Sequence, residues 1–250
     1  MPDISVCVEM VFDDEPFHER IPRAVAAGAD AVEFWGWRDK DLDAVEAAAA
    51  EADAPIAAFG AGGTLTDPGQ AEDAVETIRE SIATASELGC PTLIATTGPD
   101  QDGLDRRTQY ENVVDVLSEV AADAEDAGVT LALEPLNTEV DHPGYFLTTS
   151  AEGFDVVDDV DSPNVRLLYD VYHQQITEGN VIQTVTENVD RIGHVHVADV
   201  PGRHEPGTGE LNYANVFAAL DEAGYDGYVG CEFRPTGDPE AAMDAVLNCR

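Results

Sequence analysis

The segment Ala127-Gly-Val-Thr-Leu-Ala-Leu-Glu134 decides the fold, because a helix end, a strand-like run and a polar residue follow one another within it. Gly128 stands where a helix needs a left-handed cap. The apolar run from Thr130 is typical of a strand buried on both faces. Glu134 ends the run, and a carboxylate buried there is costly unless it is paired or coordinates a metal.

The same pattern returns three more times along the chain. Apolar runs over Val165–Asp170, Ile192–His196 and Gly227–Glu232 each finish on a polar residue. The four polar endings, counted from Glu134, are 36, 26 and 36 residues apart. Since the carboxyl ends of barrel strands meet at one mouth, we expect these four side chains to share one site.

Strand-like runs alternate with Ala/Glu-rich helical stretches along the whole chain. The expected strands are Ile4–Glu9, Ala31–Phe34, Ile56–Phe59, Thr92–Ala95, Thr130–Glu134, Val165–Asp170, Ile192–Val197 and Gly227–Glu232. The expected helices are Phe17–Ala27, Leu42–Ala52, Gln70–Leu88, Arg106–Ala127, Ser150–Asp159, Glu178–Asn188, Tyr213–Ala223 and a short one at Pro239–Leu247. Eight such repeats predict an α/β fold, a (β/α)8 TIM barrel forming a single domain over residues 1–250. The alternative is a doubly wound sheet, but Glu9-Met-Val-Phe-Asp-Asp after the first strand lacks the glycines of a phosphate-binding turn.

The net charge is extreme, with 51 acidic residues against 12 basic ones, or −39. Such a surface repels itself at low ionic strength, whereas molar salt shortens the screening length to about 3 Å. Because the acids are spread along helix faces, we expect a halophilic protein of a salt-rich cytoplasm rather than a binder of a basic partner. The charge also argues against nucleic acid as a partner, since phosphates need a basic footprint.

Export and membrane insertion are not expected from the sequence. No apolar run has the length of a membrane helix, and Met1-Pro-Asp-Ile does not begin a signal peptide. The four cysteines form no CxxC pair or metal spacing, which is typical of reduced thiols. We therefore expect a soluble, cytoplasmic protein whose partner is a small-molecule substrate.

The four strand endings form a hard, mostly oxygen donor set for a metal. Three carboxylates (Glu134, Asp170 and Glu232) and the imidazole of His196 suit Mn²⁺, Mg²⁺ or Co²⁺ better than a structural zinc. The alternative is a set of ion-paired or capping carboxylates, but cations are scarce in this chain. We expect one bound divalent ion.

Five motifs carry a resemblance to a known family. They are Leu133-Glu-Pro-Leu-Asn137, Tyr169-Asp-Val-Tyr-His173, Gly193-His-Val-His-Val-Ala-Asp199, Glu205-Pro-Gly-Thr-Gly-Glu-Leu-Asn-Tyr213 and Gly230-Cys-Glu-Phe233. Together they resemble the hydroxypyruvate isomerase family of the xylose-isomerase-like TIM barrels, whose relatives include ketose 3-epimerases and inosose-processing enzymes. The resemblance is strongest over residues 129–235, and it implies a dimer or tetramer.

The resemblance implies roles for single residues. Glu134 and Glu232 match the glutamates that bind metal and exchange the substrate proton, and Asp170 matches the metal-binding aspartate. His196 matches a further ligand, although some hydroxypyruvate isomerases carry Gln there while epimerases carry His. His173 matches a substrate-contacting histidine.

Two further contacts with substrate are expected on loops. Arg203 falls near an arginine that reaches substrate in the epimerases, although the loop length differs, and its neighbour His204 is an equal candidate. A guanidinium suits a carboxylate or phosphate. Within Phe34-Trp-Gly-Trp37 both tryptophans should lie near the mouth, where they either form an apolar wall against the substrate or pack under the rim; Trp37 is the candidate substrate contact.

The expected reaction is an aldose–ketose interconversion through an enediolate. A divalent metal polarises the carbonyl oxygen, and two carboxylates move the proton between adjacent carbons. Hydroxypyruvate and tartronate semialdehyde are the first-choice pair, and a ketose 3-epimerase or keto-acid sugar isomerase is the alternative. Two other classes remain: an endonuclease IV-like nuclease, which the charge opposes, and a barrel that binds sugars without turnover.

Overall fold

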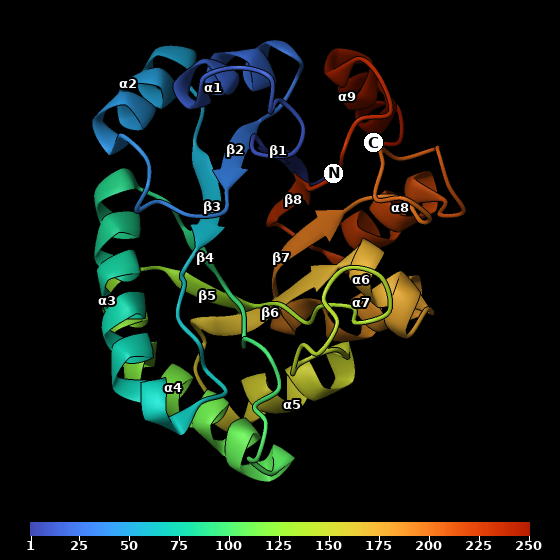
Figure 1. Cartoon of the computed structure of the whole chain (residues 1–250). Coiled ribbons are helices and arrows are strands. Elements are labelled where there is room, and N and C mark those ends of the chain that lie inside the picture. Colours follow the sequence, from blue (N-terminus) through green and yellow to red (C-terminus); the bar gives the residue numbers. More distant parts are fainter.

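Eight parallel strands close into a barrel in the computed structural model, which describes residues 1–250 (Figure 1). Each strand pairs with its sequence neighbours, and β8 closes on β1. The strands are β1 (Asp3–Cys7), β2 (Ala31–Phe34), β3 (Ile56–Gly60), β4 (Thr92–Ala95), β5 (Thr130–Leu133), β6 (Val165–Asp170), β7 (Ile192–Val197) and β8 (Tyr228–Cys231). The predicted TIM barrel is confirmed, and the doubly wound alternative is wrong because the sheet has no edge.

Helices surround the barrel, and they connect each strand to the next (Figure 1). They are α1 (Phe17–Ala26), α2 (Leu42–Ala52), α3 (Ala71–Leu88), α4 (Arg106–Ala127), α5 (Ser150–Val160), α6 (Val171–Thr177), α7 (Val181–Asn188), α8 (Tyr213–Ala223) and α9 (Pro239–Leu247), with 3-10 turns at Pro68–Gln70 and Val189–Arg191. None of these helices combines the length and apolarity needed to cross a bilayer.

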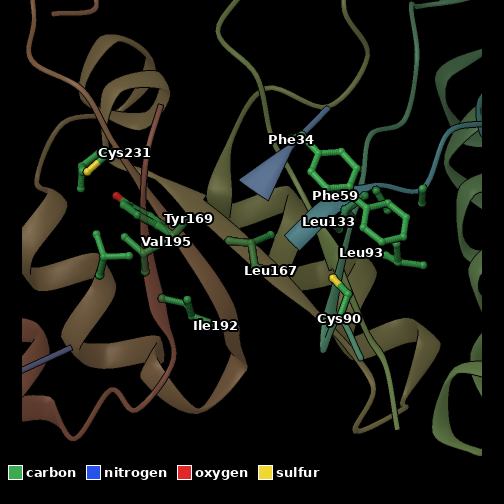
Figure 2. Packing of buried hydrophobic residues seen from close by; sticks show 14 of the residues in the cluster. Phe34, Phe59, Cys90, Leu93, Leu133, Leu167, Tyr169, Ile192, Val195 and Cys231 are labelled. Carbon is green, nitrogen blue, oxygen red and sulfur yellow. The ribbon is translucent and has the colours of Figure 1, made fainter. Parts of the chain in front are cut away.

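The strands separate two layers of apolar packing. Successive side chains of a strand point to opposite faces, so one set lies between strands and helices and the other inside the barrel. The outer set belongs to a cluster of 59 buried residues. Figure 2 shows part of it, including Phe34 and Phe59, whose rings stack with centroids 5.3 Å apart. A separate cluster of Ala58, Ile94, Ala132 and Leu168 fills the interior.

Glycines end the helices as the sequence predicts. Gly89, Gly128 and Gly224 follow α3, α4 and α8 in the left-handed conformation, with φ of 66°, 68° and 83°. A residue with a Cβ is strained there, so glycine ends the helix at little cost. Each turn then leads directly into the next strand.

One helix was not predicted. The sequence assigns no element between the strand ending at Asp170 and the helix beginning at Glu178, whereas the structure has α6 over Val171–Thr177. Asp170 ends β6 and is also the N-cap of α6, because its Oδ1 accepts a hydrogen bond from the backbone N–H of His173 at 3.0 Å. The predicted helix Glu178–Asn188 shortens to α7 as a result.

Candidate active site

Alternation along the strands brings the four predicted polar endings together at the mouth. Glu134, Asp170, His196 and Glu232 all follow the inward-facing parity of their strands. One ligand atom from each lies within 4.8 Å of the others, and all four residues are buried. Three carboxylates and an imidazole in this space form a donor set for one divalent cation.

The imidazole of His196 lies at the centre of the set. Its Nδ1 is 3.5 Å from Glu232 Oε2, 3.6 Å from Glu134 Oε1 and 4.0 Å from Asp170 Oδ2. The Nδ1 atom and Glu134 Oε1 are both buried without a hydrogen-bond partner. Buried polar atoms without partners are costly, so the residues fit a bound cation.

A fourth buried carboxylate, which the sequence did not indicate, supports His196 from below. Glu33 of β2 is 1% exposed, and its Oε1 lies 3.2 Å from His196 Nε2. Its Oε2 accepts a hydrogen bond from Ser5 Oγ at 2.9 Å and pairs with His194 Nε2 at 2.9 Å. His194 therefore lies deeper in the barrel, on the far side of Glu33 from the cavity. A carboxylate behind a ligating imidazole fixes its tautomer and orientation.

Gly230 of β8 makes room for this pair. A Cβ at that position would lie 2.3 Å from Glu33 Oε1 and 2.7 Å from His196 Cδ2. The end of β8 thus serves the site twice, because Gly230 admits Glu33 while Glu232, directly after the strand, enters the donor set.

The two catalytic candidates have unlike surroundings. Burial would raise the pKa of Glu232, but the charges of Arg203 and His196 outweigh it and hold that pKa well below its usual range. Glu232 also accepts hydrogen bonds from Arg203 Nη2 and, at 2.7 Å, from Trp35 Nε1. Burial raises the pKa of Glu134 to about 7, against the opposing effect of His196. Unequal environments of this kind separate an acid from a base.

Arg203 reaches the site from the loop between β7 and α8. Its guanidinium stacks 5.2 Å from the Tyr172 ring centroid and lies 3.9 Å from Asp170 Oδ2. Its backbone is in the left-handed region, with φ of 58°. The side chain of His204 points away, since its Nδ1 lies 2.7 Å from the carbonyl of Arg234. Between the two loop candidates, only Arg203 enters the cavity.

The loop that carries Arg203 is built around one buried carboxylate. Asp199 accepts four backbone N–H groups at 2.8–3.1 Å, those of Val200, Gly207, Gly209 and Leu211. Four charge-assisted bonds fix the course of the loop before any ligand arrives. Arg203 is therefore held over the site by a preformed loop.

His173 also faces the cavity. Its Nδ1 lies 3.2 Å from the backbone N–H of Asn137 and 2.6 Å from the amide nitrogen of that side chain. A backbone N–H can only donate, so Nδ1 is the acceptor and Nε2 carries the proton. Burial lowers the pKa of His173, which favours this neutral form. The Nε2–H is buried without a partner and is free to donate to a substrate oxygen.

A cavity of about 480 Å³ lies above these residues. Its walls are Trp35, Gly60, Gly62, Ile94, Thr96, Glu134, Leu136, His142, Tyr145, His173, His196, Arg203 and Glu232. Trp37 is not among them, because its indole N–H donates to Ser81 Oγ at 2.9 Å beneath the rim. Of the two tryptophans expected near the mouth, Trp35 forms a wall of the cavity, whereas Trp37, the one named as a substrate contact, packs below it.

Comparison with known proteins agrees with this geometry. The family model described as the xylose isomerase-like TIM barrel matches residues 21–249. The chain belongs to the xylose isomerase-like TIM barrel family. Within this family it is 34% identical to a 2-oxo-tetronate isomerase of Cupriavidus necator over 97% of this chain and 96% of the relative. It is 31% identical to the hydroxypyruvate isomerase of Escherichia coli K12, with 96% of each chain covered.

A solved structure has nearly the same fold as this chain. A protein described as AP endonuclease, family 2, from Brucella melitensis superposes with a TM-score of 0.95 at 32% identity, covering 100% of both chains. The resemblance drawn from the five motifs is thus confirmed. Glu33 was not predicted from the sequence. It lies within the run Ala31–Phe34, whereas the four predicted site residues each stand at the end of an apolar run.

Proposed function

We propose that this protein is a metal-dependent isomerase of short hydroxy-keto acids, with hydroxypyruvate and tartronate semialdehyde as its substrate pair. The observation that carries the proposal is the convergence of Glu134 and Glu232, two buried carboxylates that line the cavity and lie 3.6 Å and 3.5 Å from the same atom, His196 Nδ1. The names of the relatives from Cupriavidus necator and Escherichia coli support the same class.

The proposed metal ligands are Glu134, Asp170, His196 and Glu232, and Mn²⁺, Mg²⁺ or Co²⁺ suits their chemistry. A divalent ion bound there supplies Lewis-acid polarisation of the carbonyl oxygen. The protein's own part is to bind the substrate beside these groups and to move its proton.

The proton transfer follows from the environments of the two glutamates. Glu232, held ionised by Arg203 and Trp35, takes a proton from C3 of hydroxypyruvate, and the electrons of that C–H bond form the C2–C3 double bond of the enediolate. Glu134 then gives a proton to C2 while the proton of the C3 hydroxyl passes to the C2 oxygen, which leaves an aldehyde at C3 and a hydroxyl at C2; the proton held by Glu232 returns to Glu134 through solvent. Atoms balance, and the reverse reaction exchanges the roles.

Three side chains are placed to bind the substrate. The Nε2–H of His173 donates to a substrate oxygen, and the guanidinium of Arg203 attracts the developing negative charge. The indole of Trp35 closes one wall and limits the access of water. These roles replace the one predicted for Trp37.

A related substrate is favoured by the relatives' names. A 2-oxo-tetronate carries the same hydroxy-keto acid on four carbons, and a cavity of about 480 Å³ accommodates either acid. A ketose 3-epimerase reaction uses the same proton transfer, and the imidazole at position 196 supports it. The net charge of −39 opposes a reaction on DNA.

The test is proton NMR of hydroxypyruvate with the purified protein in heavy water, with Mg²⁺, in molar KCl, with and without a chelator. We expect tartronate semialdehyde, or deuterium at C3, in the sample without chelator alone. Glu134→Gln and Glu232→Gln should each abolish exchange, whereas Glu210→Gln on the exposed loop surface should not. Exchange with only 2-oxo-tetronate or a ketohexose would show that this compound, and not hydroxypyruvate, is the substrate. No exchange with any of the three would refute the proposed isomerase activity.

A further inference from the structure

The only lysine of the chain is buried beside the mouth of the barrel. Lys40 stands alone among eleven arginines, and its side chain is 6% exposed. It lies in the loop between β2 and α2, where its backbone N–H donates to the carbonyl of Trp37 at 3.1 Å. Burying an ammonium is costly unless its partners are well placed, so its contacts indicate what it stabilises.

The ammonium of Lys40 is enclosed by two carboxylates and two aromatic rings. Its Nζ lies 3.0 Å from Glu9 Oε1 and 3.2 Å from Asp39 Oδ1. The ring centroids of Phe17 and Phe34 are 4.8 Å and 5.6 Å away, at the distances of cation–π attraction. Asp39 is largely exposed, so Glu9 is the partner that is withdrawn from water.

Glu9 connects this lysine to the wall of the cavity. One oxygen, Oε1, faces Lys40, and the other, Oε2, accepts the backbone N–H of Trp35 at 2.5 Å. The carbonyl of Trp35 accepts the N–H of Gly60 at 2.7 Å. A Cβ on Gly60 would lie 2.1 Å from that carbonyl oxygen, so the approach requires glycine. The peptide of Trp35 is thereby held on both sides.

The side chain of Trp35 links this fixed backbone to the active site. Its indole Nε1–H donates to Glu232 Oε1 at 2.7 Å, although the residue is 47% exposed. We propose that Lys40 is a positioning residue: through Glu9 it fixes the backbone of Trp35, and so places the indole N–H on the carboxylate of Glu232.

The geometry explains why a lysine serves here in a chain that otherwise uses arginine. A compact ammonium fits between two ring faces and a carboxylate, whereas a planar guanidinium is larger and directs its donors in a fixed fork. Lys40→Arg would therefore displace Glu9 despite keeping the charge. The role of Lys40 in catalysis rests on the proposed function, whereas its role in placing Trp35 does not.

The experiment separates these two parts. In a Trp37→Phe background, Trp35 is the sole tryptophan, and its acrylamide quenching is measured for Lys40→Met, Glu9→Gln and the double variant in molar KCl. Arg38→Met is the matched control, because Arg38 leaves the same loop but pairs with Glu80 and stacks on residue 37. The turnover of hydroxypyruvate is measured on the same variants with Trp37 present.

We expect Lys40→Met to increase quenching of Trp35 and to lower kcat/KM about tenfold or more, since a misplacement of about 1 Å can cost as much as 100-fold. Arg38→Met should change neither quantity, and the double variant should lose no more than the worse single variant because both act through one contact. Unchanged quenching in Lys40→Met, or strictly additive losses, would overturn the proposal. If Lys40→Met does not fold, unchanged quenching in Glu9→Gln overturns it. If Lys40→Met alters the quenching of Trp35 but the wild type does not turn over hydroxypyruvate, the proposed function is refuted and the positioning role of Lys40 stands.

Discussion

At the scale of single residues, Glu33 supports the site from outside the substrate cavity: it does not line the cavity but contacts His196, which does. The carboxylate attracts the Nε2–H of His196, so Nδ1 is left facing the three carboxylates with which it would hold a cation. Burial would raise the pKa of Glu33, but His196 and His194 lower it to about 2, so the group remains ionised over the working range. A charged acceptor raises the basicity of the imidazole as a ligand.

Replacing Glu33 by glutamine should therefore weaken metal binding. The variant loses the charge that orients His196, and losses of about 10- to 100-fold in affinity are usual for such supporting carboxylates. Titration calorimetry with Mn²⁺ or Co²⁺ measures the change. Ser5→Ala removes only a donor to the other oxygen of Glu33 and should bind nearly as well as the wild type. Equal affinity of Glu33→Gln and the wild type would contradict this role.

At the scale of elements, the sequence predicted what depends on periodicity and on chain ends. Strands such as Thr92–Ala95 and Val165–Asp170 match the prediction at both ends, because short apolar runs define them. The first strand was predicted to reach Glu9 but ends at Cys7, whose carbonyl accepts the N–H of Met10 and so begins a turn. Helix α6 was missed since seven residues carry too little periodicity.

The site residues at strand ends were predictable from the sequence, whereas those on loops were not. Glu134, Asp170, His196 and Glu232 converge because strand endings of a barrel must meet. Loop residues follow no such rule. The choice between Trp35 and Trp37 depends on how Glu9 and Gly60 hold one peptide, and neither contact appears in a sequence pattern.

A contact between two loops should make stability depend on pH. Glu205, in the loop that carries Arg203, accepts the backbone N–H of Thr236 from the loop after β8 at 2.9 Å. Burial would raise the pKa of Glu205, but the donors of Thr236 lower it below its ordinary value. A lowered carboxyl pKa contributes stability above the unfolded pKa, and the contribution is lost as the pH falls through the folded pKa.

Glu205→Gln should thus lower the melting temperature at neutral pH and lose this deficit in acid. Melting curves from about pH 7 down to below the ordinary glutamate pKa of about 4.3 measure the difference. Glu210→Gln, on the same loop and exposed, should remain parallel to the wild type. A deficit of constant size at every pH would show that the charge of Glu205 does not contribute.

At the scale of the whole molecule, the surface charge is the dominant feature. The 12 basic residues serve 51 acids, and Arg23 alone pairs with Asp14, Glu15 and Glu240. Most acids on the long helices have no cation beside them, so their mutual repulsion opposes folding unless ions screen it. We propose that the protein is adapted to a salt-rich cytoplasm.

Salt should therefore stabilise the fold through screening, and fewer acids should lessen the need for it. The melting temperature should rise with KCl up to molar concentration, where the screening length is about 3 Å. Five exposed acids of α3 and α4 can be neutralised together, namely Glu76, Glu87, Asp115, Glu125 and Asp126. This variant should melt above the wild type at low salt and converge with it in molar KCl, because repulsion is then screened in both. If glycerol at equal water activity replaced KCl fully, or if the two curves stayed parallel, hydration rather than charge repulsion would set the salt requirement.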